Sequence, residues 1–205
     1  MPLSRITRIL SQELEDLRSE GRAKGKEFIV VDVKKPQDGK GPRFLLKGYG
    51  DKEFIRMNSN SYLGMQFDEE VIKAEEEAAR KFGVGPGAVR FISGTYITHR
   101  DLEKRLAQFH QRQDAMIFSS AYMTVVGIIS SLTTPETGII SDELNHNCII
   151  NAIRLSRPKE RYVYKHLDYD DLENGIKSLI GKVKRVIVVT DGVFSMRGDL
   201  SLIHI

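Results

Sequence analysis

The sequence predicts an α/β fold in which a mostly parallel sheet carries helices on both faces. Between residues 115 and 190, short apolar runs alternate with amphipathic segments of helical length, as in repeated β-α units. The last run, residues 186–190, is rich in β-branched residues and leads into Asp191 and Gly192, as expected for a buried parallel strand with polar groups at its carboxyl end. A chain of 205 residues with 40% hydrophobic and 29% charged side chains suits one α/β core or part of a larger domain.

The N-terminal segment, residues 1–57, is expected to hold a helix and a hairpin. Apolar residues recur at helical spacing among charged ones, at Ile6, Leu10, Leu14 and Leu17. This spacing predicts an amphipathic helix that ends near Gly21 or Gly25. After a turn-rich stretch, residues 44–57 predict a hairpin around Gly50.

Residues 58–205 are assigned to a second, partial domain, which begins with two expected helices. Asp68 can cap the first helix, and a glycine-rich stretch, residues 83–94, separates it from the second. The inner face of the first helix is expected to hold Val71, Ile72, Ala78, Ala79 and Phe82. Thr98, with Asp101 three residues later, predicts a capping box for the second helix. The inward residues of the second helix are expected to be Leu102, Leu106 and Phe109.

Strands and helices are then expected to alternate. The expected strands are residues 115–118, 138–141, 161–164 and 186–190. The expected helices are residues 122–132, 146–155 and 172–180. Because a helix separates each strand from the next, the strands are expected to run parallel.

Charge, cysteine content and hydropathy narrow the function classes. The 31 basic and 28 acidic residues are spread along the chain without a basic block interleaved with aromatics, which argues against nucleic-acid binding. The single cysteine, Cys148, excludes an internal disulfide and a multi-cysteine metal site. No apolar run approaches the ~18 residues of a membrane span. Acidic residues soon follow the N-terminal arginines, which is atypical of a transit peptide, so a cytoplasmic location is expected.

Polar side chains follow three of the expected strands. Ser119 and Ser120 stand where a strand passes into a helix, and a helix N-terminus can bind phosphate. His146 follows the next strand, where its ring can stack on a planar cofactor; a metal is not expected, because Cys148 is too close to form a zinc pair with it. Ser195 follows the last strand. Taken alone, such serines are more often helix caps, such a histidine is more often a structural or surface residue, and the last set fits a turn. Three such sets at one sheet edge nevertheless indicate a ligand site.

Two earlier polar stretches leave alternatives open. Residues 58–64 fit a simple turn as well as a binding loop. Residues 83–95 do not fit the dinucleotide-binding pattern, because Arg90 interrupts the glycine spacing and no strand leads into the stretch. They fit either a flexible linker or a ligand-facing loop that presents Arg90 and Thr95.

Four motifs at these positions resemble those of the α-oxoamine synthases, a family of pyridoxal-phosphate (PLP) enzymes of fold type I. They are N-x-Y-L-G from Asn60, G-x-G-x-G-x-x-R-x-I-S-G-T from Gly83, D-E-x-N-H from Asp142 and T-D-G-V-F-S-M-x-G-D from Thr190. The family contains glycine C-acetyltransferase (2-amino-3-ketobutyrate CoA ligase), 8-amino-7-oxononanoate synthase, 5-aminolevulinate synthase and serine palmitoyltransferase. The resemblance, which covers most of the chain, implies the PLP-dependent transferase fold.

The resemblance also implies roles for the matching residues. It assigns binding of pyridoxal 5'-phosphate to Ser120, Ala121, Tyr122, His146 and Ser195. His146 would stack on the pyridine ring and count as catalytic, Ser195 would bond the phenolic oxygen, and the other three would hold the phosphate. Asn60 would lie near the carboxylate of the amino-acid substrate, and Arg90 and Thr95 would lie in the neighbourhood of the site. Relatives often carry glycine or cysteine at the position of Ala121, but a backbone donor tolerates alanine.

Two functional groups of the family have no counterpart in this sequence. They are the lysine that forms the Schiff base and the carboxylate that keeps the pyridinium protonated, and in relatives both follow the T-D-G-V-F-S motif. The last lysine here, Lys184, precedes a strand and does not match. The sequence therefore resembles a fold truncated before the end of the large domain, and the 205 residues alone are expected to be inactive. Residues 200–205 are expected to be a foreign adapter read-through, the alternative being a natural apolar C-terminus.

The activity implied by the resemblance is condensation of a small, glycine-like amino acid with an acyl-CoA and loss of CoA. Glycine C-acetyltransferase is the favoured member. A PLP-dependent aminotransferase of the same fold and a non-catalytic truncated chain are the alternatives. The resemblance also implies a homodimer for the full-length protein.

Overall fold

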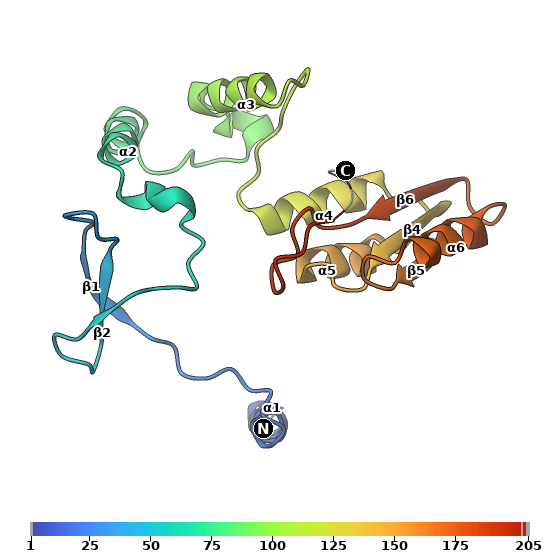
Figure 1. Cartoon of the computed structure of the whole chain (residues 1–205), viewed down its shortest axis with the longest axis horizontal. Helices are drawn as coiled ribbons and strands as arrows, with labels where there is room; N and C mark the ends of the chain where they lie inside the picture. Colours follow the sequence, from blue (N-terminus) through green and yellow to red (C-terminus); the bar gives the residue numbers. More distant parts are fainter. Residues whose placement is uncertain (1, 202, 204–205) are drawn as a thin grey trace. The chain divides into compact units, whose positions relative to one another are not determined.

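The computed structural model describes residues 2–201 and residue 203. The chain divides into two compact units, Met1–Gly87 and Ala88–Ile205 (Figure 1). The expected domain boundary after residue 57 lies inside the first unit and stays a prediction. The expectation for residues 200–205 falls partly outside the described residues, because residues 202, 204 and 205 are not among them.

The first unit contains the expected helix and hairpin. Helix α1 spans Pro2–Ser19, as the apolar spacing predicts. Strands β1 (Val30–Lys34), β2 (Arg43–Leu46) and β3 (Glu53–Phe54) form an antiparallel sheet in the order β1-β2-β3. The hairpin is the β2–β3 pair, whereas β1 was not predicted from the sequence.

A second helix completes the first unit. The 3-10 segment η1 (Tyr62–Phe67) leads into α2 (Glu69–Phe82), and Asp68 caps α2 by accepting hydrogen bonds from the N–H groups of Glu70 and Val71. The predicted cap is confirmed. No residue of α2 is fully buried. Of its expected inner face, Ile72, Ala78, Ala79 and Phe82 are half-buried, whereas Val71 is exposed.

The second unit begins with one π-helical turn, η2 (Arg90–Gly94), and helix α3 (Ile97–Phe109). The capping box predicted at Thr98 and Asp101 is wrong, because α3 begins earlier and the N–H of Tyr96 donates to His99 Nδ1 at 3.0 Å. The expected inward face of α3 is wrong at two of its three positions. Leu102 is 47% and Phe109 81% exposed, and Leu106 is half-buried, whereas the buried residues are Glu103 and Ala107.

The strand expected at residues 115–118 is not formed. A strand needs a neighbour to accept its hydrogen bonds, and within the described part of the second unit the sheet contains three strands, none of which pairs with this segment. The N–H of Ile117 donates instead to Glu103 Oε1 at 3.1 Å.

The rest of the second unit confirms the predicted alternation of strands and helices. The strands are β4 (Thr137–Asp142), β5 (Glu160–Tyr164) and β6 (Arg185–Val189), and they form a parallel sheet in the order β5-β4-β6 (Figure 1). The helices are α4 (Ala121–Leu132), α5 (Asn147–Ser156) and α6 (Tyr169–Leu179). Two crossovers, through α5 and α6, connect the parallel strands.

The central strand β4 packs on both faces. Ile139 joins a cluster with residues of α4 and α5, while its neighbour Ile140 joins a cluster with residues of α6. This alternation follows from the two-residue period of a strand. Helices therefore cover both faces of the sheet, as predicted.

Candidate functional site

One buried amide clamps the carboxyl edge of the parallel sheet. Asn145 is 4% exposed, and its Nδ2 donates to the main-chain oxygen of Val189 at 2.8 Å and to Ser141 Oγ at 2.9 Å. Its Oδ1 accepts from the N–H of Asp191 at 2.8 Å. A buried amide with its donors and acceptor paired fixes the groups that it joins. The loops that follow β4 and β6 therefore start at fixed positions beside each other.

His146 lies at this clamped edge as the N-cap of α5. Its N–H donates to Asp191 Oδ2 at 2.7 Å, and its Nδ1 accepts from the N–H of Cys148 at 3.1 Å. Burial raises the pKa of the Cys148 thiol, which lies 3.0 Å from the same nitrogen and stays protonated at neutral pH. The imidazole is thus held through one nitrogen while the residue remains exposed. Such a ring can stack on a planar group.

The start of α4 presents free main-chain donors. Ser120 is the N-cap, and its Oγ accepts from the N–H of Met123 at 3.2 Å. The N–H groups of Ala121 and Tyr122 have no partner among the residues that the structure describes. Tyr122 Oη accepts from Asn151 Nδ2 at 2.7 Å, which links the first turn of α4 to α5. Unpaired N–H groups at a helix start favour an anion such as phosphate.

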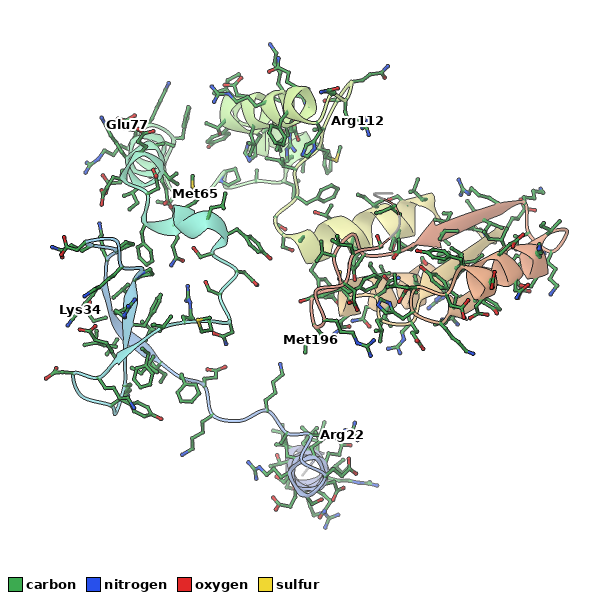
Figure 2. The ribbon with its side chains drawn as sticks, viewed as in Figure 1. Arg22, Lys34, Met65, Glu77, Arg112 and Met196 are labelled. Atoms are coloured by element: carbon green, nitrogen blue, oxygen red, sulfur yellow. The ribbon has the colours of Figure 1, made fainter. Side chains whose placement is uncertain are left out.

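Ser195 lies in a loop, residues 191–201, that folds back on itself after β6. Three main-chain hydrogen bonds of 2.7–3.0 Å close this 191–201 loop, from Phe194 to Asp199, from Gly198 to Phe194 and from Ser201 to Gly192. Phe194 is buried, whereas Ser195 is exposed. Its neighbour Met196 is 95% exposed and projects from the loop (Figure 2). The hydroxyl of Ser195 is therefore presented at the surface on a closed loop.

The sequence analysis missed His166, which bridges two carboxylates behind this edge. Its Nδ1 lies 3.0 Å from Asp142 Oδ1 and its Nε2 lies 3.1 Å from Asp199 Oδ2. Burial lowers the pKa of His166, but the hydrogen bonds to Asp142 and Asp199 outweigh it, so the pKa lies above its ordinary value. The signal in the sequence was the first acidic residue of the D-E-x-N-H motif, a buried charge that needs a partner.

Arg90 belongs to a second polar cluster, which forms around the buried Glu103. Glu103 is 1% exposed and accepts from both terminal nitrogens of Arg90, at 2.5 and 3.1 Å, and from Arg100 at 2.6 Å. The hydrogen bonds from Arg90 are the main cause that lowers the pKa of Glu103 to about 2. Thr95 Oγ1 donates to the main-chain oxygen of Arg90 at 2.7 Å. The glycine-rich stretch therefore ends in an ordered turn, and its ligand-facing role stays a prediction.

Asn60 belongs to the first unit. It is exposed and lines a polar hollow together with Arg56 and Gln66. Arg56 donates to Ser59 Oγ at 3.0 Å within this hollow. The expected contact of Asn60 with a substrate carboxylate stays a prediction.

Among residues 2–201 and 203, no group of three or more His, Cys, Asp or Glu side chains is placed to hold a metal ion. In that same part of the chain, no helix is both long and apolar enough to cross a membrane.

The sequence is similar to a known protein family and to several characterised enzymes. Residues 52–201 match the family described as aminotransferase class I and II. The chain is 40% identical over 190 residues to 8-amino-7-oxononanoate synthase 1 of Bacillus velezensis, covering 93% of this chain and 47% of the relative. It is 39% identical over 199 residues to the human mitochondrial 2-amino-3-ketobutyrate coenzyme A ligase, covering 97% of this chain and 45% of the relative.

The fold is also similar to that of solved structures. The chain superposes on the K265A variant of serine palmitoyltransferase from S. paucimobilis, solved with a bound PLP–myriocin aldimine, with a TM-score of 0.81 and 30% identity. That match covers 98% of this chain and 48% of the other. The chain thus spans about half the length of the relatives that it matches.

Proposed function

Since the chain belongs to the aminotransferase class I and II family, we propose that the full-length protein carrying it is a PLP-dependent acyltransferase. It joins a small, glycine-like amino acid to the acyl group of an acyl-CoA and releases CoA. The fold class predicted from the sequence, fold type I with a mostly parallel sheet, is confirmed.

One observation carries this proposal. The hydrogen bond from the His146 N–H to Asp191 Oδ2, at 2.7 Å, joins the D-E-x-N-H motif to the T-D-G-V-F-S motif, which are far apart in the sequence. The bond lies where open α/β sheets bind ligands, at the carboxyl ends of parallel strands. A structural role alone would need neither the exposed imidazole of His146 nor the exposed hydroxyl of Ser195 at that edge.

The residues at this edge fit the chemical parts of PLP. The free N–H groups of Ala121 and Tyr122 and the hydroxyl of Ser120 suit a phosphate. His146, held through Nδ1, would stack on the pyridine ring, and the Ser195 hydroxyl would donate to the phenolic oxygen. When bound, the cofactor withdraws electrons from the α-carbon of the amino acid, which is what forming a carbon–carbon bond there requires.

The chain's own residues would orient the reactants. In this proposal His146 would stack on the ring and shield it from water. Asn60 of the first unit would bind the amino-acid carboxylate. The donors at the start of α4 hold the phosphate, which fixes the ring relative to the sheet.

The named relatives support the acyltransferase over the aminotransferase alternative. The relatives cited above are an 8-amino-7-oxononanoate synthase and a 2-amino-3-ketobutyrate coenzyme A ligase. Within this group we favour glycine with acetyl-CoA as substrates. We also propose a homodimer in the cytoplasm; the human relative is named as mitochondrial.

The test is release of CoA by a full-length protein that carries this chain. With PLP and glycine present, we expect free thiol to form from acetyl-CoA faster than from long-chain acyl-CoA. Cys148 gives a constant background because it is buried and present in every reaction.

Two controls separate the alternatives. Omission of glycine should stop CoA release, and a 2-oxo acid supplied in place of acyl-CoA should give no new amino acid. Amino-group transfer without CoA release would support the aminotransferase, and neither activity would support a non-catalytic chain.

A further inference from the structure

Among the described residues, His166 is the one side chain outside the 191–201 loop that hydrogen-bonds to residues 193–201. In the described part of the chain, the hydrogen bonds made by residues 193–201 stay within the loop, except that between Asp199 Oδ2 and His166 Nε2 at 3.1 Å. The Phe194 ring also contacts the His166 ring edge to face, with centroids 4.3 Å apart. The other side of His166 reaches Asp142, the last residue of β4, at 3.0 Å.

Both ring nitrogens of His166 face carboxylates. An ionised carboxylate accepts hydrogen bonds and donates none. Nδ1 can therefore bond to Asp142 and Nε2 to Asp199 at the same time only when the imidazole carries both protons. The His166 side chain is 9% exposed and that of Asp142 is fully buried, so the charge-assisted bond between them forms with little competition from water. The Asp199 side chain is 38% exposed, so its bond to His166 is the more accessible of the two.

We propose that His166, as an imidazolium, is a positioning residue that holds the 191–201 loop, and with it Ser195, against the carboxyl end of β4, so that the order of the loop depends on pH. The role of His166 in ordering the loop is inferred from its contacts with Asp142, Asp199 and Phe194 alone. Its consequence for the cofactor, a weaker hold on PLP when the loop loosens, rests on the proposed function.

The charges around the ring favour the protonated form. Asp142 faces it from β4 and Asp199 from the loop, while Glu143 Oε1 accepts the main-chain N–H of His166 at 3.0 Å. Helix α6 contributes carboxylates at its start, Asp168 as its cap and Asp171 bonded to the Lys165 N–H. Lys165, which precedes His166 in the sequence, carries a positive charge, but its side chain is exposed to solvent.

The raised pKa of His166 determines how the order of the 191–201 loop changes with pH. Because the pKa of His166 is raised above 6.5 in the folded chain, its stabilising contribution is complete below pH 6.5. The contribution is lost as the pH rises through the folded pKa. The loop should therefore be closed below pH 6.5 and loosen as the pH rises through the folded pKa of His166.

The test is hydrogen exchange of the chain, measured by mass spectrometry from pH 6 to pH 10 and divided by the intrinsic rate at each pH. For the wild type, protection of the peptide 191–201 should fall roughly tenfold as His166 loses its proton, the size of one charge-assisted hydrogen bond. His166→Gln should show the lower protection at every pH, without a step. The exposed His110 supplies a matched control, since His110→Gln should keep the wild-type step.

Asp199→Ala covers the case in which His166→Gln fails to fold. It keeps the Asp142–His166 pair and should lower protection of the loop peptide while that of β4 stays high. A flat wild-type profile, or a step that persists in His166→Gln, would overturn the proposal. Titration of PLP binding to the full-length protein is read separately: no binding at any pH counts against the proposed function, whereas the exchange step still decides the role of His166.

Discussion

The two compact units use the same local signals but differ in what they bury. All six residues of β4 in the second unit are buried, and Ile140 is 0% exposed. In the first unit, Phe44 is the one buried residue among those whose burial is described, and the apolar face of α1 is exposed, with Leu14 at 52%. Caps and turns act over a few residues and need no core, whereas a core needs two apolar faces that meet. The helices and strands of the first unit therefore form without a hydrophobic core of their own.

The largest expected difference between the units is the cost of removing an apolar side chain. Ile140→Ala should lower the free energy of unfolding by about 2–5 kcal/mol, because it leaves a cavity between β4 and α6. Leu14→Ala should change it by less than about 0.5 kcal/mol. Urea unfolding followed by circular dichroism measures both, since the chain has no tryptophan. Equal losses of unfolding free energy at the two sites would contradict the proposed difference in burial between the units.

The next difference concerns ion pairs. Glu103→Gln should cost about 1.5–3 kcal/mol, because Arg90 and Arg100 lose a charged acceptor that is 1% exposed. Glu53→Gln, which breaks the exposed pair with Lys34 in the first unit, should leave the urea midpoint unchanged. A loss at Glu53 as large as that at Glu103 would mean that burial does not set the strength of these pairs.

Acid titration sharpens the same comparison. The folded pKa of Glu103 is about 2, below its ordinary value of 4.5, so its contribution is complete above pH 4.5 and is lost as the pH falls towards 2. The wild type should therefore lose more stability over this interval than Glu103→Gln does. Parallel acid profiles for the two proteins would contradict the assignment.

At the helix caps, we expect the two units to lose the same amount of stability when the cap is removed. Asp68→Ala in the first unit and Asp168→Ala in the second should each destabilise their helix by about 1 kcal/mol. Amide exchange in α2 and α6 measures this, with Asp→Ser at each position as the control that keeps a capping oxygen. A much larger effect in α6 than in α2 would show that tertiary packing amplifies even a cap.

What the sequence predicts correctly follows the same division. The Asp68 cap, the β2–β3 hairpin and the parallel β-α units depend on nearby residues or on hydrophobic period, and they were predicted. The strand at residues 115–118 needed a partner strand, and the orientation of α3 depended on the buried Glu103, so both were mispredicted.

The candidate site was predictable to a similar extent. His146 and Ser195 stand after strands, as expected, because strand ends are visible in the sequence. The clamp by Asn145 and the bridge by His166 join segments that are distant in the sequence, and spacing alone does not predict such contacts.

The central claim is that the carboxyl edge of the parallel sheet in the second unit binds PLP. Hydrogen exchange of the full-length protein, with and without PLP, tests it most directly. Exchange should slow together in three separate stretches, residues 119–123, 142–148 and 191–197, and His146→Ala should weaken the slowing in all three. Unchanged exchange in these stretches at saturating PLP, or slowing confined to other peptides, would contradict the claim.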